Sequence, residues 1–179
     1  MPLPTERQLK MARGAPLFDR AGLPHAVDYG RGEIERLLPH RDNFLLVERI
    51  TGLDPGAGRL VGRRTLAKND PMFAGHFPGA PVYPGVLLVE MAGQHALCLA
   101  SFQQRGGVSA PTDSVPVPVR LTRIRDASFV NEARPGDTLT ILTQTFDDGG
   151  WTFMALGQIY RDDTLISVSL FEAMIGGEH

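Results

Sequence analysis

Apolar residues form one nearly continuous run between Val86 and Phe102 of the 179-residue chain, with helical spacing and few polar interruptions. A helix that is apolar on all sides is buried, so the run predicts a core helix over 84–103. Pro84 suits the first helical turn, and Gly106 and Gly107 end the segment.

Shorter stretches alternate between apolar and polar residues and predict strands. They lie at 44–50, 59–66, 120–131, 138–146, 151–160 and 164–174. Turn sequences at 54–58, 134–137 and 147–150 separate several of them. One buried helix and five to six mainly antiparallel strands predict an α+β fold in which the sheet wraps around the helix.

Residues 1–32 mix proline, glycine and charges around short apolar pieces, which predicts an irregular N-terminal arm with one short helix at 6–12. A short amphipathic helix follows at 33–38 and stops at Pro39. Glycines and prolines at 106–118 predict an extended connection. We therefore expect an arm over 1–32 and a single domain over 33–179.

Glu90 is the only Asp, Glu, Lys or Arg inside the apolar helix, and an ionised carboxylate there needs a partner. Gln94 lies one turn later on the same face and can bond to it. A satisfied polar pair would explain both residues. His76 lies on the adjoining loop, whose glycines and prolines exclude regular structure, and it favours a functional site instead.

Composition narrows the functional classes. A formal charge of -2 and a pI near 6.2 give no bulk attraction to nucleic acid or anionic membranes. Arginine groups at 59–64 and 120–125 fit either a solvated strand face or docking of an acidic carrier. The single cysteine, Cys98, excludes an intrachain disulfide and fits a reducing cytoplasm. We find no signal-peptide pattern and no apolar run of the roughly 20 residues that span a bilayer.

Four motifs carry a family resemblance. They are LPHR at 38–41 with FLLV at 44–47, GHFPGAPVYPGV at 75–86, Glu90 with Gln94, and RPGD at 134–137. Over about 33–174 the chain resembles the hotdog-fold 3-hydroxyacyl-acyl carrier protein dehydratases of fatty acid and polyketide synthesis. The resemblance implies a hotdog fold and dehydration to the trans-2-enoyl thioester. Glu90, rather than Asp, resembles the branch that does not isomerise the double bond.

The resemblance also implies site roles. His76 would be the catalytic histidine and Glu90 its carboxylate partner, contributed by the other subunit of a homodimer. The Val82 carbonyl would fix the His76 tautomer, and the Gly85 N–H would hold the thioester carbonyl. The substrate-binding set is completed by Gln94, Phe77 and Pro84. Three such dimers often assemble into a hexamer.

The implied partner is an acyl carrier protein that presents the substrate on phosphopantetheine, and neither a metal nor another cofactor is required. Elimination of water needs a base near the α proton and an acid near the hydroxyl, roles that histidine and a protonated carboxyl group can fill. His40 and His95 are expected to be structural. Two alternatives stay open, a hotdog acyl thioesterase and a non-catalytic acyl-binding subunit.

Overall fold

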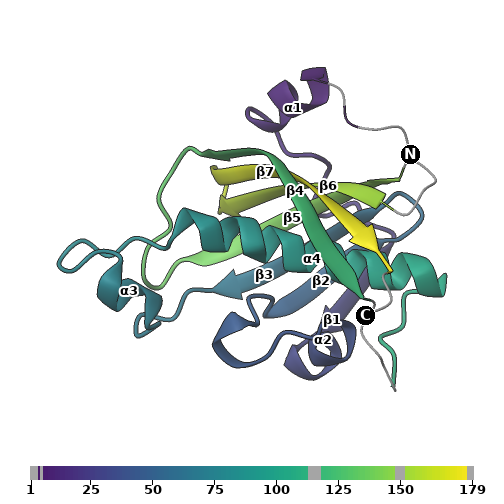
Figure 1. Cartoon of the computed structure of the whole chain (residues 1–179), viewed down its shortest axis with the longest axis horizontal. Helices are drawn as coiled ribbons and strands as arrows, with labels where there is room; N and C mark the ends of the chain where they lie inside the picture. The colour runs from purple at the N-terminus through teal and green to yellow at the C-terminus, as the bar shows by residue number, and fades with distance from the viewer. Residues whose placement is uncertain (1–3, 5, 113–117, 148–151, 177–179) are drawn as a thin grey trace.

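The computed structural model describes residues 4, 6–112, 118–147 and 152–176. Within them, seven strands form one antiparallel sheet in the order β1-β2-β3-β5-β6-β7-β4 (Figure 1). The strands are β1 (His25–Tyr29), β2 (Arg49–Asp54), β3 (Arg59–Thr65), β4 (Val119–Phe129), β5 (Thr138–Asp147), β6 (Thr152–Arg161) and β7 (Thr164–Ile175). The expected turn at 147–150 lies mostly outside the described residues.

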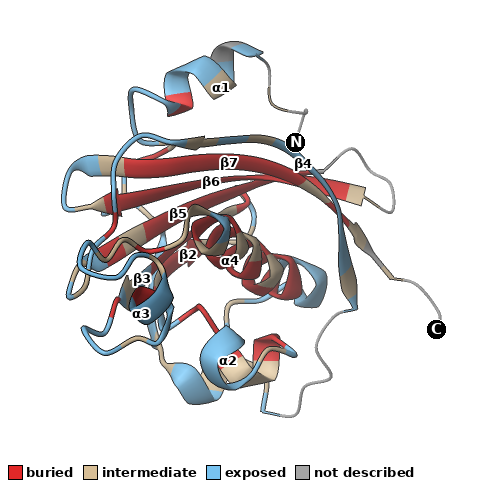
Figure 2. Cartoon of the chain, turned by 60° about the vertical axis from the view of Figure 1, so that its left-hand side comes forward, coloured by how far each residue is buried: buried red, intermediate tan, exposed pale blue. Residues whose placement is uncertain are grey.

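The sheet curves around one long helix, α4 (Gly85–Arg105), which is mostly buried (Figure 2). The shorter helices are α1 (Glu6–Ala12), α2 (Arg31–Leu37) and α3 (Met72–Gly75), with a 3-10 turn, η1, at Asp42–Phe44. Gly106 ends α4 in the left-handed conformation, with a φ of 63°. The predicted α+β fold, a sheet wrapped around a central helix, is confirmed.

Two glycines allow α4 to lie directly against the sheet. A Cβ atom on Gly62 of β3 would come within 1.9 Å of the His95 ring. On Gly157 of β6, it would come within 2.5 Å of the Ala92 Cβ. Larger residues at either position would push the helix away, so these glycines set the distance between the two layers.

Two expectations about the first third of the chain are wrong. Residues 25–29 form β1, which pairs with β2 as an edge strand, although they lack the apolar alternation of a half-buried strand. Residues 45–48 are not a strand, and β2 begins only at Arg49. The buried apolar side chains of residues 45–47 gave a strand-like pattern, but side chains of Gln94 and Arg64 bond to this backbone.

Residues 6–18 of the N-terminal arm cover the face of the sheet opposite α4 (Figures 1 and 2). Gln158 of β6 is fully buried beneath it. Its side chain accepts a hydrogen bond from the Leu17 N–H at 2.8 Å and donates to the carbonyls of Ala12 and Ala15. Phe18 packs on apolar residues of the same sheet face. The arm thus shields an apolar surface from water.

By length and composition alone, α4 meets the criteria for a helix that could cross a membrane. However, 67% of its apolar window is buried inside the fold. Core helices of soluble proteins meet the same criteria, so the apolar character of α4 is accounted for by its packing against the sheet.

His95 should make the fold sensitive to acid. Its ring is fully buried and neither ring nitrogen has a hydrogen-bond partner among the described residues. Burial lowers the pKa of His95 from 6.5 to about 3. The unfolded chain can protonate His95 below pH 6.5, whereas the folded protein keeps the ring neutral down to about pH 3. The free energy of unfolding is therefore highest above pH 6.5 and decreases as the pH falls toward 3.

We expect the free energy of unfolding to fall by about 2 kcal/mol more in the wild type than in a His95→Leu variant between about pH 7 and pH 5. Urea titrations at both pH values measure the difference. Equal pH dependence in the two proteins would contradict the role of His95.

Candidate functional site

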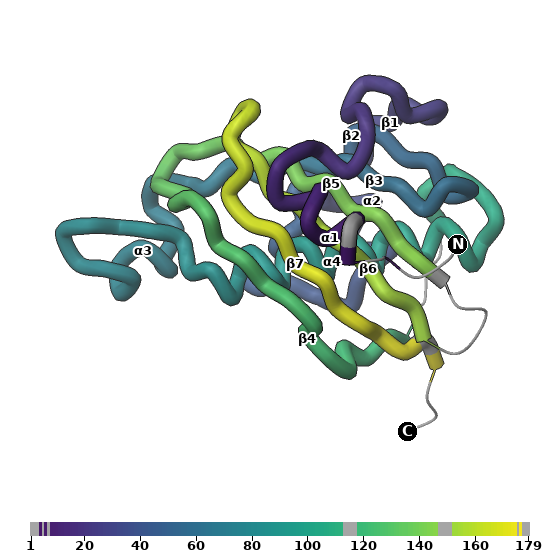
Figure 3. Tube along the Cα trace, turned by 90° about the horizontal axis from the view of Figure 1, so that it is seen from above, coloured from purple at the N-terminus to yellow at the C-terminus, as the bar shows by residue number. Residues whose placement is uncertain are grey.

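His76 follows α3 on a loop that extends beyond the end of the sheet (Figures 1 and 3). Its Nδ1 lies 2.9 Å from the Val82 carbonyl oxygen, the contact that the sequence led us to expect. A carbonyl can only accept, so Nδ1 carries the proton and Nε2 of the neutral ring keeps a free lone pair. The Val82 N–H returns a hydrogen bond to the His76 carbonyl at 2.9 Å. The loop therefore holds a histidine whose outer nitrogen can accept a proton.

The start of α4 lies in the same pocket as His76, which has a volume of about 430 Å³. Gly85, the first residue of the helix, lines this pocket together with Val82. N–H groups in a first helical turn have no partner within the helix, so they can bind an oxygen placed before them. A Cβ on Gly85 would meet the Phe129 ring at 2.9 Å, which explains glycine at this position.

Pro84 and Phe77, two further residues expected to bind substrate, are next in the chain to residues that line this pocket. Pro84 is the N-cap of α4, and its carbonyl accepts hydrogen bonds from the N–H groups of Leu87 and Leu88. Phe77 is 56% exposed and its ring stacks on His76 with centroids 4.0 Å apart. The peptide bond between His76 and Phe77 is cis.

Glu90 is held by Gln94, as the spacing of the two residues predicts. The Gln94 amide donates to Glu90 Oε1 at 2.9 Å and to the Phe44 carbonyl at 2.8 Å. Its oxygen accepts the Leu46 N–H at 2.7 Å. Gln94 is fully buried, and the side chain bonds both to the carboxylate and to the segment behind it. The position of Glu90 thus depends on one satisfied amide.

His40 also belongs to this part of the site, which the sequence did not reveal. Its Nε2 lies 3.5 Å from Glu90 Oε1. Burial lowers the pKa of His40, and the Glu90 carboxylate opposes that effect. We expected His40 to have a structural role, in capping or in fixing a turn. The LPHR motif that contains His40 was the only signal in the sequence.

Glu90 and His76 do not line the same pocket among the described residues. Glu90 lies in a second pocket of about 200 Å³, formed by His40, one face of α4 and residues of β4 and β7. Val86 borders both pockets and is 73% exposed. In a single chain, His76 and Glu90 thus lie in two separate pockets, which form two halves of the candidate site.

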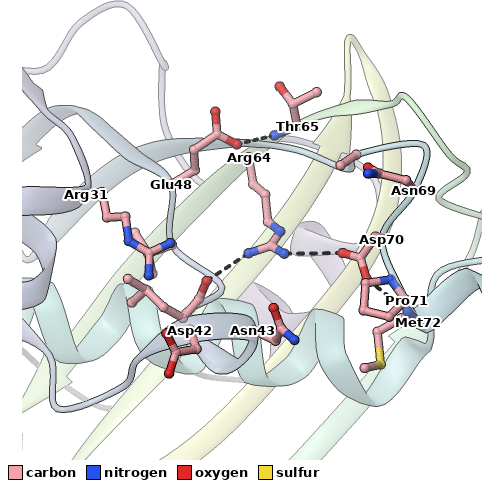
Figure 4. A pocket seen from close by; sticks show the side chains of 13 residues that line it. Arg31, Asp42, Asn43, Glu48, Arg64, Thr65, Asn69, Asp70, Pro71 and Met72 are labelled. Atoms are coloured by element: carbon pink, nitrogen blue, oxygen red, sulfur yellow. Dashed lines mark hydrogen bonds and ion pairs between the residues drawn. The ribbon is translucent and has the colours of Figure 1, made fainter.

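Arg64 connects the segment that is bound by Gln94 with the segment that leads into α3 and the His76 loop (Figure 4). Its guanidinium donates to the Leu45 carbonyl at 3.0 Å, next to the segment bound by Gln94. It also lies 3.6 Å from Asp70 Oδ2, just before α3. Arg64 therefore has a structural role, because it links two segments of the chain, and it does not belong to a solvated strand face.

In the second arginine group, Arg125 and Arg123 of β4 lie 2.7 and 4.0 Å from Glu172 of β7. These exposed pairs connect neighbouring strands, as expected for a solvated strand face. Such pairs contribute little to stability.

A curved antiparallel sheet around one helix, with a histidine loop before the helix and a carboxylate inside it, defines a hotdog-fold protein. Residues 38–169 match the model of the FabA-like domain, and the chain belongs to this family.

Named relatives are similar over most of their length. The chain is 37% identical over 147 residues to the 3-hydroxyacyl-[acyl-carrier-protein] dehydratase FabZ of Syntrophotalea carbinolica, covering 79% of this chain and 91% of the relative. It is 40% identical to the protein of the same name from Syntrophomonas wolfei, covering 80% and 94%. In the structure of the dehydratase heterocomplex ApeI:P from Xenorhabdus doucetiae, one chain has a TM-score of 0.64 at 15% identity, covering 81% and 91%, which shows a shared fold.

Gln94→Leu should destabilise the protein, because it leaves the buried Leu46 N–H and Phe44 carbonyl without partners. We expect a loss of about 3 kcal/mol in the free energy of unfolding. Gln104→Leu is the matched control, since Gln104 lies on the same helix but is exposed. Urea denaturation of both variants measures the difference, and equal losses would show that the Gln94 contacts do not stabilise the fold.

Proposed function

We propose that the protein removes water from a 3-hydroxyacyl thioester to give the trans-2-enoyl thioester, with His76 as base and Glu90 as acid. The contact that fixes the His76 tautomer carries the proposal, because it leaves Nε2 free to take a proton in the pocket that contains the start of α4. The names of the relatives, 3-hydroxyacyl-[acyl-carrier-protein] dehydratase, support the same reaction.

In this mechanism, His76 Nε2 takes the proton from C2 of the substrate. The N–H of Gly85, at the positive end of the helix dipole, stabilises the negative charge that develops on the thioester oxygen. Glu90 donates a proton to the C3 hydroxyl, which leaves as water while the C2–C3 double bond forms. Transfer of a proton from His76 to Glu90 then restores the starting state.

Gln94 and His40 position the acid. Both contacts fall on Glu90 Oε1. This favours Oε2 as the oxygen that carries the proton toward the substrate. The two contacts together also limit rotation of the carboxyl group while the proton is transferred.

A homodimer would join the two halves of the site. β4 is an edge strand, and Leu121, Ile124 and Phe129 on it are about half exposed. Apolar edge strands favour pairing with another chain, and pairing of two β4 edges gives one continuous sheet. The extended His76 loop of one chain would then reach the Glu90 pocket of the other. A hexamer of three such dimers stays a prediction.

The substrate carrier is an acyl carrier protein with phosphopantetheine, in agreement with the names of the relatives. We place the reaction in fatty acid synthesis or a polyketide-type pathway in the cytoplasm. The one cysteine, Cys98, is buried in α4, where burial raises the pKa of its thiol, so a thiolate nucleophile is not part of this mechanism.

His76→Ala and Glu90→Gln should each lower the rate of hydration of a 2-enoyl thioester about a thousandfold, because each removes one proton-transfer group. Mass spectrometry of the thioester products measures the rate. His25→Ala is the matched control, since this exposed histidine lies on the edge strand β1. Full activity of either site variant would overturn the assignment. Release of free thiol from a 3-hydroxyacyl thioester, without formation of an enoyl product, would indicate a thioesterase instead.

A further inference from the structure

Gly93 lies in the middle of α4 and has no steric reason within the chain to be glycine. A Cβ atom built on it meets no atom within 4 Å, in contrast to Gly62 and Gly157, where a Cβ would collide with the helix or its side chains. Glycine inside a helix costs about 1 kcal/mol relative to alanine. Because glycine destabilises the helix at this position, we expect the empty space beside Gly93 to have a function.

That space belongs to the Glu90 pocket. Glu90, Gly93 and Leu97 are spaced by three and four residues, so they follow one another along a single face of the helix. Opposite them, the wall is formed by apolar residues of β4 and β7, among them Phe171 and Ala173. Gln94 also lines the pocket, but its amide is already bonded to Glu90 and to the backbone of Phe44 and Leu46. Beyond the carboxylate, the lining is therefore suited to hydrocarbon.

The mechanism places C3 of the substrate at Glu90. Gly93 lies about 4.5 Å further along the helix axis and Leu97 about 10 Å further, from the rise per residue of an α-helix. These distances correspond to a few methylene groups and to a medium-length acyl chain. The carbons beyond C3 would pass directly over Gly93.

On the basis of the proposed function, we propose that Gly93 is a specificity-determining residue. Because Gly93 has no side chain, the pocket can accept acyl chains that extend past the first helical turn after Glu90. A side chain at this position would close the passage while leaving Glu90, Gln94 and His40 in place. Short substrates end before Gly93 and would not meet the new side chain.

The test compares 3-hydroxybutyryl and 3-hydroxydecanoyl thioesters of the same carrier in the wild type, Gly93→Ala and Gly93→Val. We expect Gly93→Val to lower kcat/KM for the decanoyl substrate about tenfold or more relative to the butyryl substrate, with Gly93→Ala intermediate. Alanine favours the helix, so the smaller variant should fold at least as well as the wild type. Gly107→Val is the matched control, because Gly107 also faces open space but does not line this pocket.

Equal losses for both substrates, or dissociation of the dimer by Gly93→Ala in size-exclusion chromatography, would overturn this inference. Dissociation would mean that a partner chain, not the acyl chain, fills the space. A wild type that dehydrates neither substrate would overturn the proposed function and the inference with it. A selective loss with an intact dimer supports both.

Discussion

The close packing of α4 against the sheet determines where the residues of the site lie. The helix has almost no polar face, so it is stable only when the sheet removes it from water. Gly62 and Gly157 make that packing possible by leaving room for His95 and Ala92. Once the helix is fixed, its N-terminus lies beside the His76 loop and its Glu90 lines a pocket between α4 and the sheet.

Burial of α4 also determines how its polar residues behave. Gln94 has its hydrogen-bonding capacity used by Glu90 and by the backbone near η1, so the carboxyl group is oriented by a part of the chain that does not touch substrate. His95, one residue later, faces the sheet and has no such partner among the described residues. One face of α4 thus carries Glu90 and the amide that orients it. The other face packs against the sheet, and the buried His95 on it lowers the stability of the fold in acid.

The sequence predicted those elements whose characteristic pattern lies within one short segment of the chain. The run at 84–103, the strands from 120 onward and the loop around His76 were recognisable because their periodicity or their glycines and prolines lie within one segment. β1 was missed because an edge strand needs little apolar alternation. Residues 45–47 resembled a strand because burial of their side chains, not pairing of their backbone, fixed their composition. The contact of His40 with Glu90 and the open space at Gly93 arise only from the tertiary fold.

We propose that each active site takes His76 from one chain and Glu90 from the other. Coexpression of the His76→Ala and Glu90→Gln chains tests this arrangement. In a mixed dimer, one of the two sites keeps both residues, so random pairing should restore about a quarter of wild-type dehydration activity. No recovery in a mixture shown to contain mixed dimers would mean that both residues act within one chain, and it would contradict the account.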